Sequence, residues 1–401
     1  MKISKRIGAL EESQSLQMAA RCQQLRAEGV DVISMSLGEP DFAAPLHVKE
    51  AAKRAVDEDY SHYGPTPGFP SLRQAIAKNL NEDLASYGVR PYDANEIIVS
   101  VGAKQAICNA IQALIDPEDE VILPTPCWVS YVEMVKLAEG KSVLVKTTME
   151  NNYCLTPEQL EAAITPKTRL LLICTPNNPT GSVYSHDQLV GIVNVLKRHP
   201  EITVLSDEIY AHIQYIGKHE GLGQFPEIQD RIIIINGVSK AYAMTGYRIG
   251  WMACHDKNLI GACKRLQGQM ITCATTIAQK AAEAAYVGQQ DCVAEMREAF
   301  HRRRDLIVKL AKEIPGLKIV EPQGAFYLFP DVSAYFGKQY NGQTIHNATE
   351  LVDYLLNEAH VACVSGIAFG EDNCIRFSYA TSEENITEAM YRVKEALAKL
   401  H

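Results

Sequence analysis

The sequence predicts an α/β protein with a large domain around a seven-stranded, mostly parallel sheet and a smaller α/β domain. The chain has 401 residues, which is too long for one compact core. Its middle repeats short apolar, β-branched runs followed by turn residues and helical periodicity, as in a parallel sheet covered on both faces. After about residue 290 this alternation stops and a long amphipathic pattern begins, which predicts the second domain.

Seven apolar runs in the middle of the chain are the expected strands. Each is short and rich in branched aliphatic residues, and each is followed by glycine, proline or polar residues. The expected strands are 97–101, 121–123, 142–145, 170–174, 203–205, 232–235 and 249–253. They define one doubly wound domain, which we assign to residues 45–290.

The two flanks are expected to form the smaller domain together. Residues 1–44 offer one helix around 13–28 and a loop. Residues 291–401 begin with a long helix, because apolar residues recur on one helical face from Val293 to Ile314.

The last helix is expected to open at a capping box. Thr381 and Glu384 have the three-residue spacing that such a box requires. The apolar face of this helix then consists of Ile386, Met390, Val393 and Leu397.

Composition and charge favour small-molecule chemistry in the cytoplasm. The formal net charge of −9 offers no basic footprint for nucleic acid or anionic lipid. The 11 cysteines stand singly without C-x-x-C spacing, so neither a zinc site nor a redox motif is signalled. No apolar run approaches a membrane span, and no apolar signal segment follows the basic N-terminus. We therefore expect no metal, no nucleic-acid partner and no membrane anchor.

Glycine, polar and aromatic residues gather where the expected strands end. Ligands of open parallel sheets bind beyond the carboxyl ends of the strands. Gly102 and Ala103 open a helix directly after a strand, so free backbone N–H groups and the positive end of the helix dipole suit a phosphate. The alternative is an ordinary tight turn between strand and helix.

Lys240 and Arg248 follow the apolar strand 232–235. A lysine amine at a partly dry strand end has a lowered pKa and can attack an aldehyde. Arg248, eight residues later, is a permanent cation of the kind that a dianionic phosphate requires. The alternative is that both are surface charges.

Three motifs follow strand ends in a fixed order, and further motifs extend over the whole chain. In these motifs the chain resembles the aspartate aminotransferases of the prokaryotic subgroup, which are class I aminotransferases and pyridoxal-phosphate enzymes of fold type I. The segments that carry the resemblance are Leu37-Gly38-Glu39-Pro40-Asp41-Phe42, Trp128-Val129-Ser130-Tyr131, Asn177-Asn178-Pro179-Thr180-Gly181, Ser206-Asp207-Glu208-Ile209-Tyr210, Gly237 to Gly250, Gly324-Ala325-Phe326-Tyr327 and Ile375-Arg376-Phe377-Ser378-Tyr379-Ala380.

The resemblance implies that Lys240 holds pyridoxal 5′-phosphate covalently and is nucleophile and general base in turn. Asp207 would face the pyridine nitrogen and keep it protonated, and Tyr210 would hydrogen-bond the phenolate oxygen. Trp128 would stack on the ring, although a tryptophan that only fills core is the alternative. The other expected cofactor contacts are Gly102, Ala103, Lys104, Asn178, Ser239, Arg248 and, from the neighbouring subunit of a homodimer with shared sites, Tyr63.

The same resemblance implies the substrate contacts. Arg376 would bind the α-carboxylate through a bidentate fork, next to a backbone contact from Gly38. Trp128 and Asn178 would line this half of the site. Lys104 would contact the distal carboxylate of a dicarboxylic substrate, helped by the hydroxyl residues Ser13 and Ser15. The alternative is that Lys104 only complements the phosphate or lies in solvent.

The expected reaction is transfer of the amino group of L-aspartate to 2-oxoglutarate with ping-pong kinetics. Alternatives on the same fold are an aminotransferase that prefers aromatic amino acids or prephenate, and a C–S lyase or a cyclopropane-forming synthase. A non-catalytic regulator is a third class, but the chain has neither spare residues nor basic charge for a DNA-binding helix-turn-helix.

Two positions depart from the family pattern. Gly237 stands where many relatives carry a serine that contacts the phosphate, so that contact is either lost or taken over by Ser239. Cys127 stands where a tyrosine commonly precedes the tryptophan.

Overall fold

A computed structural model describes all residues from 1 to 401, and all seven predicted strands form one sheet. Their ends shift by at most two residues from the predicted ones. The strands are β2 (Ile97–Ser100), β3 (Glu120–Thr125), β4 (Lys141–Lys146), β5 (Thr168–Cys174), β6 (Thr203–Asp207), β7 (Ile232–Gly237) and β8 (Gly250–Cys254). The predicted fold class is therefore confirmed.

The sheet has the order β2-β8-β7-β6-β5-β3-β4, and β8 alone runs antiparallel to its neighbours. Consequently the start of β8 lies at the same edge as the carboxyl ends of the parallel strands. Gly250, the first residue of β8, pairs with Gly237 at the end of β7. Both ends of the segment from 237 to 250 therefore lie at this edge of the sheet.

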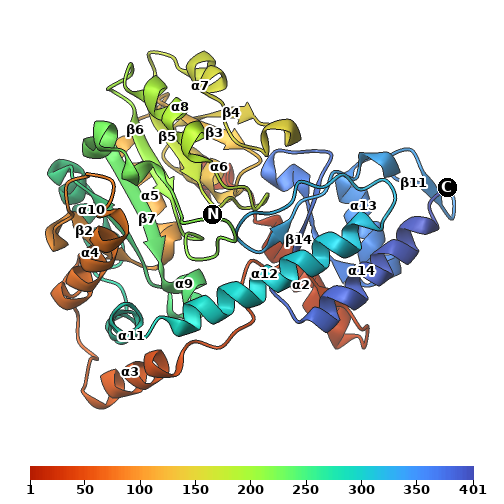
Figure 1. The fold of residues 1–401 in the computed structure, drawn as a ribbon, viewed down its shortest axis with the longest axis horizontal. Helices are drawn as coiled ribbons and strands as arrows, with labels where there is room; N and C mark the ends of the chain where they lie inside the picture. Colours follow the sequence, from red (N-terminus) through yellow and green to blue (C-terminus); the bar gives the residue numbers. More distant parts are fainter.

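Helices cover both faces of the sheet (Figure 1). Alternate residues of β5 point to opposite faces, with Leu170 and Leu172 in one core cluster and Leu171 and Ile173 in the other. This is why the central strands read as continuous apolar runs. The first cluster packs under α5 (Gly102–Leu114), α6 (Ser130–Leu137) and α10 (Lys257–Met270), and the second under α4 (Pro70–Leu84), α8 (His186–Leu196) and α11 (Thr276–Val287).

The long helix α12 (Asp291–Lys312) leads from the sheet to a second, smaller part of the molecule (Figure 1). An antiparallel sheet of order β13-β14-β9 lies there. The start of the chain packs with it, because β1 pairs in parallel with β12. The elements of this part are α2 (Gln14–Ala27), β1 (Ile33–Ser34), β9 (Tyr327–Leu328), α13 (Ala348–Tyr354), β12 (Val361–Ala362), β13 (Val364–Ser365), β14 (Ile375–Ser378) and α14 (Glu383–Ala398).

The start of α14 corrects the predicted capping box. Ser382, in extended conformation, is the N-cap, and its hydroxyl accepts a hydrogen bond from the backbone of Asn385. Thr381 lies one residue too early and accepts from the Asn385 side chain instead. Both hydroxyl residues suit a cap, and the backbone direction decides between them. The predicted apolar face is buried as expected.

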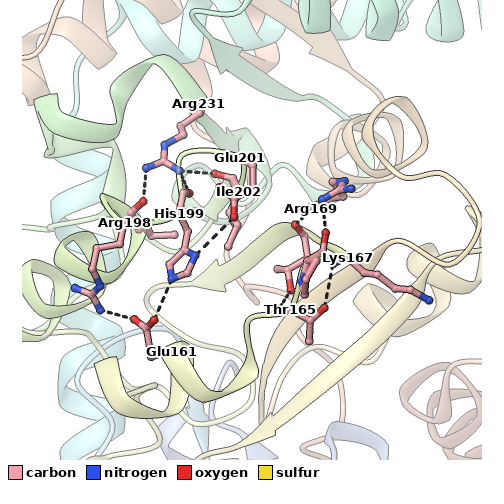
Figure 2. Close-up of polar contacts among 12 residues, drawn as sticks. Glu161, Thr165, Lys167, Arg169, Arg198, His199, Glu201, Ile202 and Arg231 are labelled. Atoms are coloured by element: carbon pink, nitrogen blue, oxygen red, sulfur yellow. Dashed lines mark hydrogen bonds and ion pairs between the residues drawn. The ribbon is translucent and has the colours of Figure 1, made fainter.

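A polar network closes the opposite edge of the sheet, where the parallel strands begin (Figure 2). Arg231 donates to the carbonyl oxygens of Leu196 and Ile202 at 2.6 and 2.9 Å and also to that of His199. Glu161 accepts from Arg198 and contacts His199. Arg231 thus adds hydrogen bonds to carbonyl groups at and just after the end of α8. The network fixes α8 against the sheet far from the edge described next.

No helix of the chain combines the length and the apolar character that crossing a membrane requires.

Candidate active site

A cavity of about 360 Å³ opens at the edge where the parallel strands end. It contains nearly all the residues that the sequence singled out, although they come from segments far apart in the chain. The predicted residues that line it are Ser13, Ser15, Gly38, Ala103, Lys104, Trp128, Asn178, Asp207, Tyr210, Ser239, Lys240, Arg248 and Arg376.

Lys240 lies in the short helix α9 (Val238–Ala241) directly after β7. Its Nζ donates a hydrogen bond to the carbonyl oxygen of Gly38 at 2.5 Å. Burial lowers the pKa of the Lys240 amine to about 8, with further lowering by Arg248, whereas the charge of Glu39 acts in the opposite direction. An amine with this pKa is partly unprotonated near neutral pH, as a nucleophile must be.

Asp207 ends β6 and is only 2% exposed. One carboxylate oxygen accepts a hydrogen bond from the Tyr131 hydroxyl at 2.6 Å, and the other accepts from the Ile209 N–H at 3.2 Å. Burial raises the pKa of Asp207 to about 6, while the bond from Tyr131 opposes this rise. A carboxylate held in this way would be stabilised by a positive group in the cavity.

Arg376 lies in β14 and is 2% exposed. Its Nη1 donates to Asn178 Oδ1 at 2.9 Å and its Nη2 to the Ser36 carbonyl oxygen at 2.6 Å. Its Nε is buried without any hydrogen-bond partner. Because a guanidinium has five N–H groups, this arginine keeps donors for an anion.

The guanidinium of Arg376 packs against the aromatic rings of Tyr327 and Phe369, whose centroids lie 4.5 and 4.8 Å from Cζ. The Tyr327 hydroxyl is 2.8 Å from the hydroxyl of Tyr210. Burial raises the pKa of Tyr210 well above its ordinary value, so this phenol keeps its proton near neutral pH.

Three backbone segments meet closely where a phosphate was expected. Gly102 has a φ of +75°, and a Cβ there would lie 2.5 Å from Arg248 Nη2. A Cβ on Gly250 would overlap the Ala103 backbone. The N-cap of α5, Val101, provides no side-chain hydrogen bond, so the first N–H groups of this helix stay available. Ala103 and Arg248 line the cavity, whereas Gly102 packs against the Arg248 side chain without lining it.

The departure at Gly237 has a steric cause. A Cβ at this position would lie 2.7 Å from Gly250 Cα and 2.8 Å from the Ile249 carbonyl oxygen. A serine would therefore require a shift of β8, whereas Ser239 is buried and lines the cavity. Cys127 is also buried, and its N–H donates to the Phe369 carbonyl oxygen at 3.0 Å.

Lys104 and Trp128 form one wall of the cavity. Lys104 Nζ lies 4.7 Å from the centroid of the Trp128 ring, and Trp128 is half-buried, which is not the position of a pure core residue. Burial lowers the pKa of the Lys104 amine, followed by the repulsion of Arg248. Ser13 and Ser15 reach the same cavity on a segment that Glu11 ties to α6, because its N–H donates to Glu133 Oε2 at 2.9 Å.

Tyr63 is the one predicted residue that neither lines the cavity nor stands next to a lining residue in the sequence. It is 87% exposed and lies in a separate surface depression with Ser61 and Thr275. Two other residues of the site, Tyr131 and Tyr327, received no role from the sequence. The only signal for Tyr131 was its place three residues after Trp128, which puts both at the same end of α6.

Comparisons with known proteins agree with this geometry. Residues 30–393 match the family model described as aminotransferase class I and II. The chain is 42% identical to the aspartate aminotransferase of Bacillus subtilis, with 100% of both chains covered. It is also 42% identical to a Petunia hybrida protein, bifunctional aspartate aminotransferase and glutamate/aspartate-prephenate aminotransferase, covering 100% of this chain and 84% of the relative.

Solved structures show the same relationship. The aspartate aminotransferase of Rhizobium meliloti superposes with a TM-score of 0.95 at 41% identity over 100% of both chains. That of Thermus thermophilus with maleate superposes with a TM-score of 0.92 at 38% identity, covering 99% of this chain and 100% of the other. The resemblance inferred from the motifs is thus confirmed, and the chain belongs to the class I and II aminotransferase family.

Proposed function

We propose that the protein transfers the amino group of L-aspartate to 2-oxoglutarate with pyridoxal 5′-phosphate as cofactor. The observation that carries the proposal is that the Lys240 amine, the Asp207 carboxylate and the Arg376 guanidinium face one cavity. The names of the relatives above support aspartate as a substrate. Initial rates at several aspartate and 2-oxoglutarate concentrations should give the parallel double-reciprocal lines of a ping-pong reaction. Intersecting lines, or no product, would contradict the proposal.

The residues of the cavity fit pyridoxal phosphate. The amine of Lys240 suits the aldehyde, and the buried carboxylate of Asp207 suits a protonated ring nitrogen. Arg248 and the first N–H groups of α5 suit the phosphate, Ser239 lies beside them, and Trp128 offers a ring face. When bound, this cofactor withdraws electrons from the Cα atom of an amino acid.

The chain's own groups perform the remaining steps. Lys240 would bind the aldehyde of the cofactor and, once the substrate amine has displaced it, would move a proton from the substrate Cα atom to the cofactor carbon on the other side of the substrate nitrogen. Asp207 would keep the ring nitrogen protonated, and Tyr131 orients its carboxylate. Tyr210 and Asn178 donate toward the phenolate oxygen. Arg376 fixes the α-carboxylate with help from the Gly38 backbone.

The distal carboxylate is proposed to bind Lys104, with Ser13 and Ser15 beside it. Lys104→Ser should lower kcat/KM for aspartate, with a loss of transition-state stabilisation of about 2–4 kcal/mol. The reason is that one substrate charge would lose its partner in a partly dry site. An uncharged donor such as alanine should lose far less. The measurement is the ratio of kcat/KM for aspartate to that for alanine.

Lys167→Ser is the matched control for this prediction. Lys167 is exposed at the opposite edge of the sheet (Figure 2). The ratio should stay at its wild-type value in the control and fall in Lys104→Ser. An unchanged ratio in Lys104→Ser would assign the distal carboxylate to another residue.

Arg248 is proposed to retain the phosphate. Arg248→Ala should release cofactor during dialysis that leaves the wild-type protein loaded, because the phosphate loses a charge-assisted partner worth about 1.5–3 kcal/mol. Bound cofactor is measured by absorbance after dialysis. Arg198→Ala, which removes an exposed arginine at the far edge, should retain cofactor like the wild type. Equal retention in both variants would contradict the role of Arg248.

We further propose a cytoplasmic homodimer in which Tyr63 reaches the phosphate site of the partner subunit, with residues 45–290 as the cofactor domain and residues 1–44 and 291–401 as the smaller domain. The 87% exposure of Tyr63, away from its own chain's cavity, supports the exchange. Sedimentation equilibrium that returns the mass of a single chain would contradict the dimer.

Amino transfer to prephenate is a second candidate. It is favoured by the names of two relatives, the Petunia hybrida protein and the aspartate/prephenate aminotransferase of Nitrosomonas europaea. Rates with prephenate and 2-oxoglutarate as competing acceptors would separate the two activities. The relatives named here are all aminotransferases, so the lyase alternative gains no support from them.

A further inference from the structure

Tyr327 lines the cavity without a role in the function proposed above. It is 1% exposed, and its hydroxyl is 2.8 Å from that of Tyr210. Its ring lies 4.5 Å from the Arg376 guanidinium carbon. A Cβ on Gly38 would overlap the Tyr327 hydroxyl, so the backbone at Gly38 packs directly against it. One side chain thus contacts a cofactor residue and two substrate residues of the proposed site.

The sheet register places the Tyr327 ring against Arg376. Tyr327 in β9 pairs with Ser378 in β14, and Arg376 stands two residues before Ser378. Residues two apart share one face of a strand, so Tyr327 and Arg376 are diagonal neighbours on that face. The Phe369 ring also lies over the guanidinium, with its centroid 4.8 Å from Cζ, so two aromatic rings pack against this group.

The hydroxyl of Tyr327 acts on Tyr210. Each phenol has one proton to donate, and the only hydrogen-bond partner of the Tyr327 hydroxyl is the hydroxyl of Tyr210. When Tyr210 donates its proton into the cavity, the proton of Tyr327 is left to bond the Tyr210 oxygen. A phenol that accepts a hydrogen bond becomes a stronger donor.

We propose that Tyr327 is a positioning residue for both halves of the site. Its hydroxyl holds Tyr210 as a donor toward the phenolate oxygen of the cofactor, and its ring holds Arg376 in the plane that receives the α-carboxylate. The inference rests on the proposed function, because it requires the roles given there to Tyr210 and Arg376.

Tyr327→Phe removes the hydroxyl and keeps the ring, so it tests the first half. In the cofactor-loaded protein, the midpoint of the pH-dependent change in visible absorbance should rise by about half a pH unit, since a less stabilised phenolate binds its proton more tightly. The dissociation constant of maleate, followed by the same absorbance, should stay within about twofold of wild type because the ring remains.

Tyr327→Leu removes the ring as well, so it tests the second half. The dissociation constant of maleate should then rise about five- to tenfold, the effect of losing one cation–π contact to a desolvated guanidinium. Tyr335→Phe is the matched control, because it removes another buried tyrosine hydroxyl that donates to the Pro315 carbonyl oxygen in the smaller part of the molecule. The control should leave both quantities unchanged.

Three outcomes would overturn the inference or its basis. A midpoint in Tyr327→Phe that moves by less than about a tenth of a pH unit removes the role of the hydroxyl. An equal rise of the maleate constant in Tyr327→Phe and Tyr327→Leu removes the role of the ring. If Tyr327→Leu does not fold, Tyr327→Met takes its place in the test of the ring, since the long methionine side chain fills more of the space without an aromatic face. A wild-type protein without a pH-dependent visible band would instead overturn the proposed function.

Discussion

Replacing Lys240 with alanine should reduce transamination more than a hundredfold, equivalent to a loss above about 2.7 kcal/mol in the activation free energy. Lys240 is the only amine proposed both to bind the aldehyde and to move the substrate proton, and the Gly38 carbonyl oxygen holds its Nζ in the cavity. The measurement is kcat with saturating aspartate and 2-oxoglutarate. Lys257→Ala, at the exposed start of α10, should keep wild-type turnover.

The fold of Lys240→Ala can be checked in the cofactor-free protein through its pH dependence. The pKa of Lys240 is about 8 in the folded chain, below its ordinary value of 10.5. Between these pH values the unfolded chain therefore binds more protons at Lys240 than the folded chain does. As a result, Lys240 makes the free energy of unfolding increase as the pH rises from 8 to 10.5. Lys240→Ala should fold and lack this increase. An unfolded variant, or turnover above a hundredth of wild type, would contradict the assignment.

Replacing Asp207 with asparagine should lower kcat/KM by about 10²–10³-fold, because a protonated ring nitrogen would lose its buried counter-charge, worth about 3–5 kcal/mol. The amide keeps the size of the carboxylate and removes its charge. The loss should appear mainly in kcat, since the substrate carboxylates keep Arg376 and Lys104 as partners.

Glu208→Gln is the matched control for Asp207→Asn. Glu208 is the next residue and is also buried, but its carboxylate accepts from Ser206 at 2.8 Å and contacts His219 at 3.2 Å outside the cavity. Its loss of kcat/KM should stay below about tenfold. Equal losses in the two variants would show that Asp207 acts on stability and not on the ring nitrogen.

The sequence predicted well what depends on one strand and the loop after it. Asp207 and Lys240 each follow an apolar run, and parallel strands must end at a common edge. The motif spacing then placed Arg248 near the same edge, because a turn and an antiparallel strand follow Lys240.

Contacts between distant segments could not be predicted in this way. The hydrogen bond between Tyr131 and Asp207 joins residues 76 apart, and that between Tyr210 and Tyr327 joins residues 117 apart. No local pattern fixes such pairs, because the first depends on how α6 packs on the sheet and the second on how the smaller part packs against it. The N-cap of α14 could not be predicted to the exact residue either. Thr381 and Ser382 both carry a hydroxyl group, and only the backbone direction decides that Ser382 is the cap.

The two halves of the cavity are attached to different parts of the fold. The cofactor and the substrate could therefore stay bound for different lengths of time. The groups proposed to hold the cofactor, from Ala103 to Arg248, lie in segments that follow or precede strands of the large sheet. Gly38, Tyr327 and Arg376 instead belong to segments that pair within the smaller part. A small movement of that part would release a keto acid while the cofactor keeps all its attachments. The protein could thus discharge the first keto acid while the amino group stays on the cofactor for the second keto acid to collect.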